Sequence, residues 1–425
     1  MGPLASTTRR VPLTDASAAI VNSASAIVYD VSRLIRRRAS LRPTGIDRID
    51  LEFLRTLSAQ SGDRLKLVTL SGNRPVFLSQ TEGRYLIQRL SRVWLEDDGA
   101  PVSIPRLFEY RGLATARSSV GLSQSQEQGT IHSVMKLAAL VRRTCFPGYQ
   151  GARVKGIDGG FAYVNVGHHG LPRSPKSLEI LANLGMTKIF AYLHDLIPIS
   201  HPEFLPSGSA RRFLDFLEAL CSCPNVEFLV NSSATMGELR EWMHARNLDN
   251  SVSIVPPSLN HVGRHVRSHC LLPNRAAFFL TVGSIEPRKN HALLLAIWRR
   301  LAQRFGPRTP KLIIAGHFGW NSGDILHQIK TGSVAESFVE LRLGLDDAEV
   351  FQLMARCRAV LVPSHTEGFG LPVAEALEIG APVIASDIPA FREFQAPGLT
   401  LVDPLDGTRW LDEIVAHAML EAAAP

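Results

Sequence analysis

The sequence has only five cysteines, and they are scattered: Cys145, Cys221, Cys223, Cys270 and Cys357. None of them forms a zinc-binding pattern, and Cys221-Ser-Cys223 is too closely spaced for an ordinary structural zinc pair. An odd, scattered set argues against a disulfide framework and favours reduced thiols in a cytosol. The cysteines therefore indicate a cytoplasmic protein without structural zinc.

Long apolar runs are also missing. No stretch approaches the roughly 20 apolar residues that a membrane-spanning helix needs. The first 25 residues contain Arg9 and Arg10 but no compact apolar segment, so no secretory signal is expected. We predict a flexible extension over residues 1–25. Aromatic residues make up only 7% of the chain, and no nucleic-acid motif accompanies its basic residues, so no nucleic-acid partner is predicted.

The glycine-rich motifs that bind common cofactors are missing too. The spacing of a P-loop does not occur, and Gly156-Ile-Asp-Gly-Gly160 is too poor a motif to bind a dinucleotide. What is present is the composition of a globular protein, with 45% hydrophobic and 20% charged residues. Because 425 residues exceed a single hydrophobic core, we expect two or three domains.

The most informative segment is Glu367-Gly-Phe-Gly-Leu-Pro-Val-Ala-Glu375. The apolar run Ala359-Val-Leu-Val-Pro-Ser364 before it is typical of a buried parallel strand, and Pro372 suits the first turn of a helix. The unit therefore places a helix N-terminus, which attracts phosphate, at the carboxyl end of a sheet, where ligands bind in open α/β folds. Because carboxylates repel phosphate, Glu367 and Glu375 are predicted to accept hydrogen bonds from sugar hydroxyls. Phosphate and hydroxyl binding together predict a nucleotide sugar.

A second strand–turn–helix unit lies upstream. Phe278-Phe-Leu-Thr-Val282 is predicted to be a strand, Gly283 begins the turn, and an apolar-periodic helix follows from His291 to about Phe305. Asn290 is predicted to be the N-cap residue of that helix.

Arg288 and Lys289 precede this helix, where the helix dipole and their own charge both favour an anion. Arginine can bind a phosphate with two donors, and lysine acts as a point charge. A solvated basic pair in a loop is the alternative, since such pairs are common.

These two units resemble the retaining glycosyltransferases of family 4, which have the GT-B fold. The resemblance rests on Val282-Gly-Ser-Ile-Glu-Pro-Arg-Lys-Asn-His291 and on the E-x7-E spacing of Glu367 and Glu375. It covers roughly Phe278 to Asp403. The amino-terminal half matches more loosely, through Pro43–Arg48, Asn165–His168 and His194–Pro198.

The resemblance implies a role for each motif residue. Arg288 and Lys289 would hold the donor diphosphate, with the helix amides near Gly370 and Leu371. Glu375 would contact the ribose of the nucleotide, and Glu367 the transferred hexose. Retention of the anomeric configuration is likewise implied by the family.

Alternating strands and helices predict two Rossmann-like, doubly wound α/β domains that face a central cleft. We place the acceptor-binding domain over residues 26–260, a linker over 261–274, and the nucleotide-sugar domain over 275–425, with a closing helix from about Trp410 to Glu421. The polar patch from Ser118 to Gln128 is predicted to be a loop or an insertion.

Three residues of the amino-terminal half are candidates for the same cleft. Gly45 would let the backbone approach the diphosphate closely, unless it is an ordinary loop glycine. His194 and Asp195 follow the predicted strand Ile189–Leu193 directly. A loop histidine is often structural, but the resemblance places His194 beside the transferred sugar. Asp195 would orient His194 or meet the acceptor hydroxyl, which the sequence leaves open.

The expected function is hexose transfer from a nucleotide sugar, with mannose from a GDP donor suggested by similar bacterial polysaccharide-assembly enzymes, to a glycan or lipid-linked acceptor. No D-x-D sequence is present, so cations of the protein rather than a divalent metal are expected at the diphosphate, and no cofactor is expected. A sugar-nucleotide epimerase with the GT-B fold and a non-catalytic sugar-nucleotide binder are the alternatives.

The net charge of +7 raises the question of a further partner. Arg33–Arg42 is a basic cluster, and Ile131–Arg143 is an amphipathic basic stretch. Docking on the anionic inner face of a cytoplasmic membrane is one interpretation, and a solvated basic outer face is the other.

Overall fold

The structure is a computed structural model that describes most of the chain. The described residues are 10–38, 40, 42–71, 74–95, 157, 159–168, 176–259, 262, 278–331 and 337–418. The basic stretch Ile131–Arg143, the polar patch Ser118–Gln128 and, apart from Val262, the predicted linker 261–274 lie outside them.

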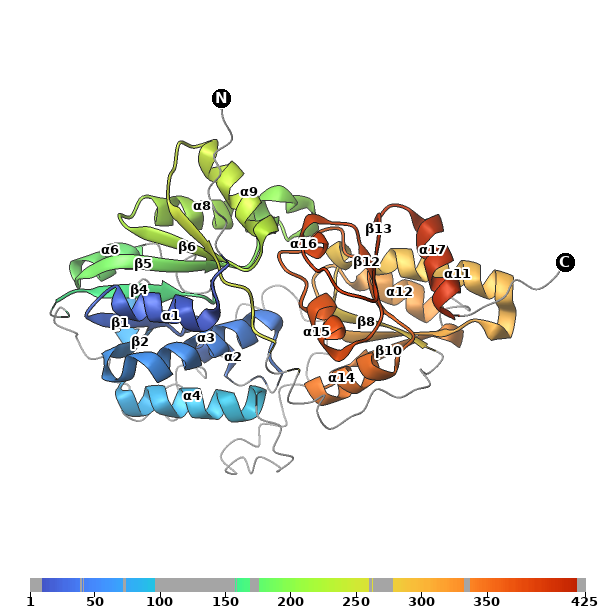
Figure 1. Cartoon of the computed structure of the whole chain (residues 1–425), viewed down its shortest axis with the longest axis horizontal. Helices are drawn as coiled ribbons and strands as arrows, with labels where there is room; N and C mark the ends of the chain where they lie inside the picture. Colours follow the sequence, from blue (N-terminus) through green and yellow to red (C-terminus); the bar gives the residue numbers. More distant parts are fainter. Residues whose placement is uncertain are drawn as a thin grey trace, which may run out of the picture.

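Two sheets organise the chain, one on either side of the predicted linker (Figure 1). The first has the order β3-β2-β1-β4-β5-β6-β7 and is parallel except for the antiparallel β2–β3 pair. Its strands are β1 (Ala26–Asp30), β2 (Leu65–Ser71), β3 (Arg74–Phe77), β4 (Phe161–Asn165), β5 (Met186–Leu193), β6 (Val226–Val230) and β7 (Ser251–Ile254). The helices with it are α1 (Leu13–Asn22), α2 (Ser32–Arg37), α3 (Gly45–Ser61), α4 (Gln80–Trp94), α6 (Lys176–Asn183), α7 (Ile197–Ser200), α8 (Ser209–Cys221) and α9 (Ser233–His244).

The second sheet has the order β10-β9-β8-β11-β12-β13, and its recorded strand pairs are parallel. Its strands are β8 (Phe278–Ile285), β9 (Lys311–Phe318), β10 (Val339–Leu343), β11 (Val360–Val362), β12 (Val383–Ser386) and β13 (Leu399–Val402). The helices with it are α11 (His291–Phe305), α12 (Gly323–Thr331), α14 (Asp347–Arg356), α15 (Leu371–Ile379), α16 (Pro389–Arg392) and α17 (Gly407–Ala418).

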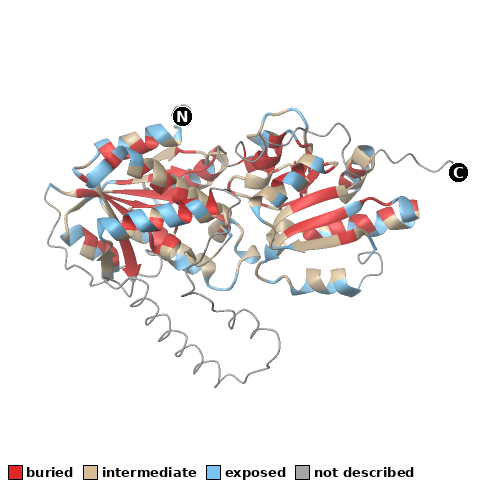
Figure 2. Ribbon diagram, turned by 90° about the horizontal axis from the view of Figure 1, so that it is seen from below, coloured by how far each residue is buried: buried red, intermediate tan, exposed pale blue. Residues whose placement is uncertain are grey.

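Each sheet is buried on both faces, as helices on both sides require. In β1, Val28 belongs to one hydrophobic core, whereas Ile27 and Tyr29 belong to the core on the opposite face. In β8, Leu280 and Phe279 divide in the same way. Figure 2 shows the buried strands lying between helices whose outer faces are exposed. The predicted doubly wound α/β class is therefore confirmed.

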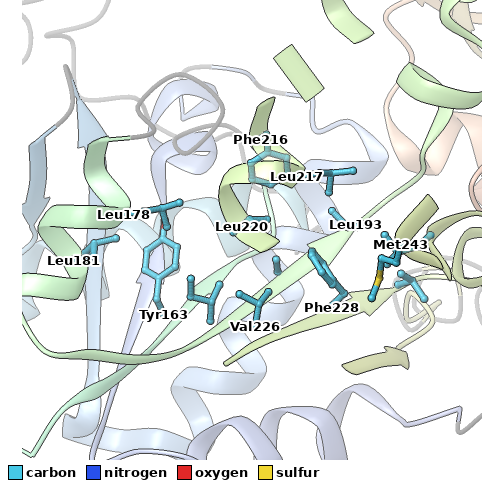
Figure 3. Close-up of a cluster of buried hydrophobic side chains, with 14 of the residues drawn as sticks. Tyr163, Leu178, Leu181, Leu193, Phe216, Leu217, Leu220, Val226, Phe228 and Met243 are labelled. Atoms are coloured by element: carbon cyan, nitrogen blue, oxygen red, sulfur yellow. The ribbon is translucent and has the colours of Figure 1, made fainter. Parts of the chain in front are cut away.

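We call the part of the chain built around the first sheet the first lobe and the part built around the second sheet the second lobe. In the first lobe, helix α8 shows how residues at helical spacing cover one face of the sheet. In α8, Phe213, Phe216, Leu217 and Leu220 recur at the spacing of one helical face. Figure 3 shows the last three against Phe228 of β6, in the cluster that all five residues share.

The prediction of a flexible extension over residues 1–25 is wrong where the structure describes it. Leu13–Asn22 is helix α1, whose Ile20 and Val21 are buried in the core beside α3. Arg10 forms an ion pair with Glu393 of the second lobe at 2.7 Å. The alanine- and serine-rich composition did not predict this short helix. Small residues such as Ala16 and Ser17 pack closely in a core but give little hydrophobic periodicity.

Asn290 is the N-cap residue of α11, as predicted, although its side chain makes no hydrogen bond to the helix. The residue adopts a left-handed backbone conformation (φ 54°), and its side chain donates to the carbonyl of Pro404. Asparagine tolerates this conformation better than most residues. The strands β3, β10 and β13 were not expected from the sequence, since none of them is a continuous apolar run. The closing helix runs from Gly407 to Ala418.

Candidate active site

A cavity of about 800 Å³ lies between the two lobes and is lined by residues of both. The loops that follow β5, β8 and β11 contribute to it, so it sits at the carboxyl ends of parallel strands. The residues predicted from the sequence all line this cavity: Gly45, His194, Asp195, Gly283, Arg288, Lys289, Glu367, Gly370, Leu371 and Glu375.

The glycine-rich turn after β11 brings a helix end to the cavity. Gly370 has φ 94°, a conformation that glycine adopts freely, and α15 begins at the next residue, Leu371. A Cβ at position 370 would also collide with the ring of Phe391. Since Gly370 and Leu371 both line the cavity, the positive end of the α15 dipole faces it.

Arg288, Lys289 and Glu367 form an ion cluster in the second lobe. One Arg288 nitrogen lies 2.6 Å from a Glu367 oxygen and another lies 2.7 Å from Glu286. Lys289 is paired with the other Glu367 oxygen. The two cations predicted to bind phosphate are thus paired with two carboxylates, Glu367 and Glu286.

The electrostatics of the cluster keep Glu367 ionised. Burial by itself would raise the pKa of Glu367, but Arg288 and Lys289 more than offset it and lower this pKa to about 2. Burial lowers the pKa of Lys289, whereas Glu367 acts in the opposite direction. Another anion placed beside these cations in the position of Glu367 would be attracted by the same positive charge.

Glu375 lies one helical turn inside α15 and is only 4% exposed. Arg48 of α3, from the opposite lobe, places a nitrogen 3.6 Å from a Glu375 oxygen and pairs with Asp347 as well. Arg48 also has a buried Nε for which no partner is recorded in the described part of the chain. Sequence reasoning did not assign Arg48 a role, although it ends the loosely matching segment Pro43–Arg48.

His194 is held at the end of β5 by a contact between its Nε2 and the carbonyl oxygen of Val166 at 2.8 Å. Burial lowers the pKa of His194 well below its usual range, and the nearby His168 lowers it further, so the ring is neutral at pH 7. Because Nε2 faces a carbonyl, it carries the proton, and Nδ1 is left as an acceptor. A sugar hydroxyl could donate to that atom.

Asp195 is half-buried at the cavity, and one of its oxygens accepts a hydrogen bond from the amide of Ile197 at 3.1 Å. Burial raises the pKa of Asp195, and Arg288 lowers it. The neighbouring carboxylates Glu367 and Glu286 raise it again. Asp195 is thus electrostatically linked to the ion cluster of the other lobe.

The basic cluster Arg33–Arg42 is not simply an outer face. Arg33, Arg37 and Arg42 line the cavity from the first lobe, opposite the ion cluster. The two interpretations offered by the sequence, membrane docking and a solvated surface, did not include this position in a cavity wall. A pattern of basic residues does not reveal which way a loop turns them, and only the path from α2 to α3 decides it.

Gly368 joins the two lobes beside His194 and Asp195. Its carbonyl accepts hydrogen bonds from Ser232 Oγ at 2.6 Å and from Thr235 Oγ1 at 3.1 Å. A Cβ at position 368 would collide with the backbone carbonyl of His194 and come within 2.8 Å of the Asp195 Cβ. Only glycine permits this close approach.

We therefore expect Gly368→Ala to hold the lobes apart and to lower turnover by about 100-fold, because small misplacements of reacting groups cost that much. Steady-state kinetics and thermal unfolding would measure the effect. Gly237→Ala in α9 is the matched control, since an added methyl group there meets nothing within 4 Å. Wild-type turnover in Gly368→Ala would show that the close contact between the lobes at Gly368 does not position the residues of the cavity.

Among the residues that the structure describes, no three histidine, cysteine, aspartate or glutamate side chains come together as a metal site. In the same ranges, no helix is both long and apolar enough to cross a membrane.

Comparison with solved structures shows the fold. Sucrose-phosphate synthase from Thermosynechococcus elongatus superimposes with a TM-score of 0.54 at 16% identity, covering 93% of this chain and 90% of that one. HepE from Anabaena, solved with UDP and glucose, gives 0.52 at 15% identity, covering 92% and 89%. The predicted GT-B arrangement is therefore confirmed.

Sequence comparison shows the family. The profile described as "Glycosyl transferases group 1" matches residues 267–414. The serotype-specific mannosyltransferase WbdA of Escherichia coli is 28% identical over 238 residues, which cover 53% of this chain but only 29% of that protein. The O-antigen chain mannosyltransferase RfbU of Salmonella typhimurium is 42% identical over 250 residues, which cover 56% of this chain and 67% of RfbU. This chain belongs to the group 1 glycosyl transferases.

Proposed function

We propose that the protein is a retaining, metal-independent glycosyltransferase that moves a hexose from a nucleoside-diphosphate sugar to a glycan or lipid-linked acceptor. The observation that carries the proposal is the meeting of Arg288, Lys289, Glu367 and Glu375 in one cavity at the N-terminal end of α15. A diphosphate needs the cations and the helix end, and sugar hydroxyls need the carboxylates.

The donor would lie mainly against the second lobe. Its diphosphate would replace Glu367 beside Arg288 and Lys289, and Glu375 would accept hydrogen bonds from the ribose. Glu367, once released from the cations, would turn to the hexose hydroxyls. The glycines Gly45, Gly283 and Gly370 leave room for the backbone to approach the ligand, and Leu371 contributes the first amide of α15.

In the reaction, the bond between the anomeric carbon and the diphosphate oxygen breaks, and its electron pair stays on the departing diphosphate. Arg288 and Lys289 would stabilise that charge, which is the role a metal ion plays elsewhere. The acceptor hydroxyl oxygen forms the new bond to the anomeric carbon, and its proton passes to the leaving phosphate. His194 and Asp195 would orient the hexose and the acceptor hydroxyl.

The names of two relatives support a choice of the transferred sugar and of the process in which the protein acts. WbdA and RfbU are named as mannosyltransferases, and RfbU as one of O-antigen chains. We therefore propose mannose from a GDP donor and a role in bacterial polysaccharide assembly in the cytoplasm. Contact with an anionic membrane surface is part of this proposal, and Arg84, Arg89 and Arg92 are exposed on α4 for it.

The test is to incubate GDP-mannose and other nucleotide sugars with the protein, with and without lipid-linked glycan acceptors. Nucleoside diphosphate that appears only with acceptor supports transfer, whereas an altered donor sugar without acceptor would indicate an epimerase. Donor binding that raises the melting temperature without any product would indicate a binder. EDTA is expected to change the rate by less than about twofold, because fixed cations replace the metal. Anionic vesicles added to the assay should raise the rate on lipid-linked acceptors.

A further inference from the structure

The first-lobe wall of the cavity contains a second cluster of cations, distinct from the Arg288–Lys289 pair. Arg33 and Arg37 lie one turn apart on α2, so they project from the same face of that helix. Arg42 follows in the loop toward α3. We call these three residues the arginine cradle; each of them lines the cavity.

The cradle is built on one buried carboxylate. Asp47 has no exposed surface, and its two oxygens accept hydrogen bonds from Arg33 Nε at 2.7 Å and from Arg37 Nε at 3.1 Å. The same carboxylate accepts hydrogen bonds from the amide and from the hydroxyl of Thr44, at 2.8 Å each. Thr44 is the N-cap residue of α3. All of the acceptor capacity of Asp47 is therefore used, and this carboxylate fixes both guanidinium groups by their Nε edges.

The remaining edges of the cradle are available to a ligand. Arg33 also donates to Thr44, and Arg37 donates to Ser40 and to the carbonyl of Arg42. Within the described ranges, no partner is recorded for the Nη1 atoms of Arg33 and Arg37 or for the guanidinium of Arg42. Three cations against one carboxylate leave positive charge in excess.

The cradle and the proposed diphosphate site belong to different lobes of the protein. Arg288, Lys289 and the α15 end occupy the second-lobe wall, whereas the cradle occupies the first-lobe wall. Its charge reaches the reaction centre, since Arg33 adds to the effect of burial in lowering the pKa of His194. Arg42 extends across the cavity to Gly344, where a side chain would collide with it.

The surroundings of the cradle are those of a substrate site. Val93, Trp94 and Leu95 form an apolar wall of the same cavity. The indole of Trp94 donates to the carbonyl of Ser40 at 2.8 Å, which ties this wall to the α2–α3 loop. Fixed guanidinium groups beside an apolar wall match a phosphate ester attached to an apolar or sugar moiety.

We propose that the arginine cradle binds a phosphate group carried by the acceptor, so that the acceptor is a phosphorylated sugar or a phosphate-bearing lipid. This inference rests on the proposed function, because it assigns the donor diphosphate to the opposite wall. The acceptor would then carry an anionic phosphate, which the arginines would hold by charge-assisted hydrogen bonds in the same cavity as the donor.

The experiment measures phosphate binding to the full chain with the donor site already filled. Wild type saturated with GDP is titrated calorimetrically with glucose 1-phosphate and with dihexanoyl phosphatidic acid, which present a phosphate on a sugar and on a lipid. Arg42→Gln is expected to weaken binding of both by about 10-fold or more, as the loss of one charge-assisted contact predicts. Arg37→Gln should do the same. Arg300→Gln, on the exposed face of α11, is the charge-matched control and should bind like wild type.

Each outcome decides a separate point. Whichever of the two probes binds more tightly identifies the source of the phosphate, and either result supports the cradle. Equal affinity of wild type and Arg42→Gln for both probes would overturn it, as would a phosphate probe that cannot bind beside GDP. Weaker GDP binding in Arg42→Gln would assign these arginines to the donor and leave the proposed function standing. If wild type binds no nucleoside diphosphate, the proposed function fails, whereas arginine-dependent phosphate binding would still support the cradle.

Discussion

Lys289→Ala is expected to lower the turnover number by about 100- to 1,000-fold, which is the usual effect of removing one fixed donor from a developing negative charge. Lys289 is half-buried in the cavity wall and paired with Glu367, so its ammonium group is held in a fixed position beside the proposed diphosphate site. Without it, the diphosphate leaves with only Arg288 and the α15 end to stabilise its charge. Transfer kinetics with saturating donor and acceptor measure the loss.

The fold should survive this substitution. Arg288 remains to pair with Glu367 at 2.6 Å, so the carboxylate is not left without a cation. Lys330→Ala, an exposed position on α12 in the same lobe, removes the same charge away from the cavity and serves as the control. Turnover in Lys289→Ala equal to that of wild type would refute the role of Lys289 in the departure of the diphosphate.

Glu367→Gln is expected to separate donor binding from transfer. Glu367 is paired with Arg288 and Lys289, so removal of its charge makes both cations available to phosphate. The affinity for free nucleoside diphosphate should therefore stay constant or rise. Turnover should fall by about 100-fold, because a neutral amide holds the hexose hydroxyls less strongly than a carboxylate. Calorimetric titration with GDP and transfer kinetics give the two readings.

The same variant has a predicted pH signature. The folded-state pKa of Glu367 is lowered from 4.5 to about 2, so ionised Glu367 stabilises the fold above pH 4.5. That contribution, roughly 3 kcal/mol by linkage, is lost as the pH falls from 4.5 toward 2. The difference in unfolding free energy between wild type and Glu367→Gln should thus be largest near neutral pH and shrink in acid.

Glu378→Gln, on the exposed side of α15, provides the matched control for both readings. It should leave turnover, GDP affinity and the pH profile of stability unchanged. If Glu367→Gln instead lost GDP affinity in proportion to its turnover, the carboxylate would not be competing with phosphate for the two cations.

The second lobe could be predicted from the sequence in some detail, because its signals are local. The run Phe278–Val282, the turn at Gly283 and the periodic helix from His291 to Phe305 follow one another along the chain, and helix α11 has those bounds. Strand, tight turn and helix N-terminus dictate their own geometry within about 20 residues, as they do again around Gly370. The chemistry of phosphate and hydroxyl binding could be inferred from that geometry.

The first lobe could be predicted less well from the sequence, because the contacts that place its helices and arginines join segments far apart in the chain. Helix α1 packs on α3, more than twenty residues away, and its small residues carry no strong periodic signal. Arg33, Arg37 and Arg42 could be recognised as basic but not as part of a cavity wall, since the buried Asp47 that orients two of them lies in the next helix.

The doubly wound class and the two strand–turn–helix motifs follow from the amino-acid sequence alone, because they depend on chain-local hydrogen bonding and hydrophobic periodicity, and the resemblance to family 4 identified the expected donor residues. The contacts across the cleft follow from the three-dimensional fold: Arg48 pairs with Glu375, the Gly368 carbonyl accepts a hydrogen bond from Ser232, and the arginine cradle lines the same cavity as Arg288. Such contacts join residues up to hundreds of positions apart, and they depend on how two rigid lobes pack against each other, which no local pattern encodes.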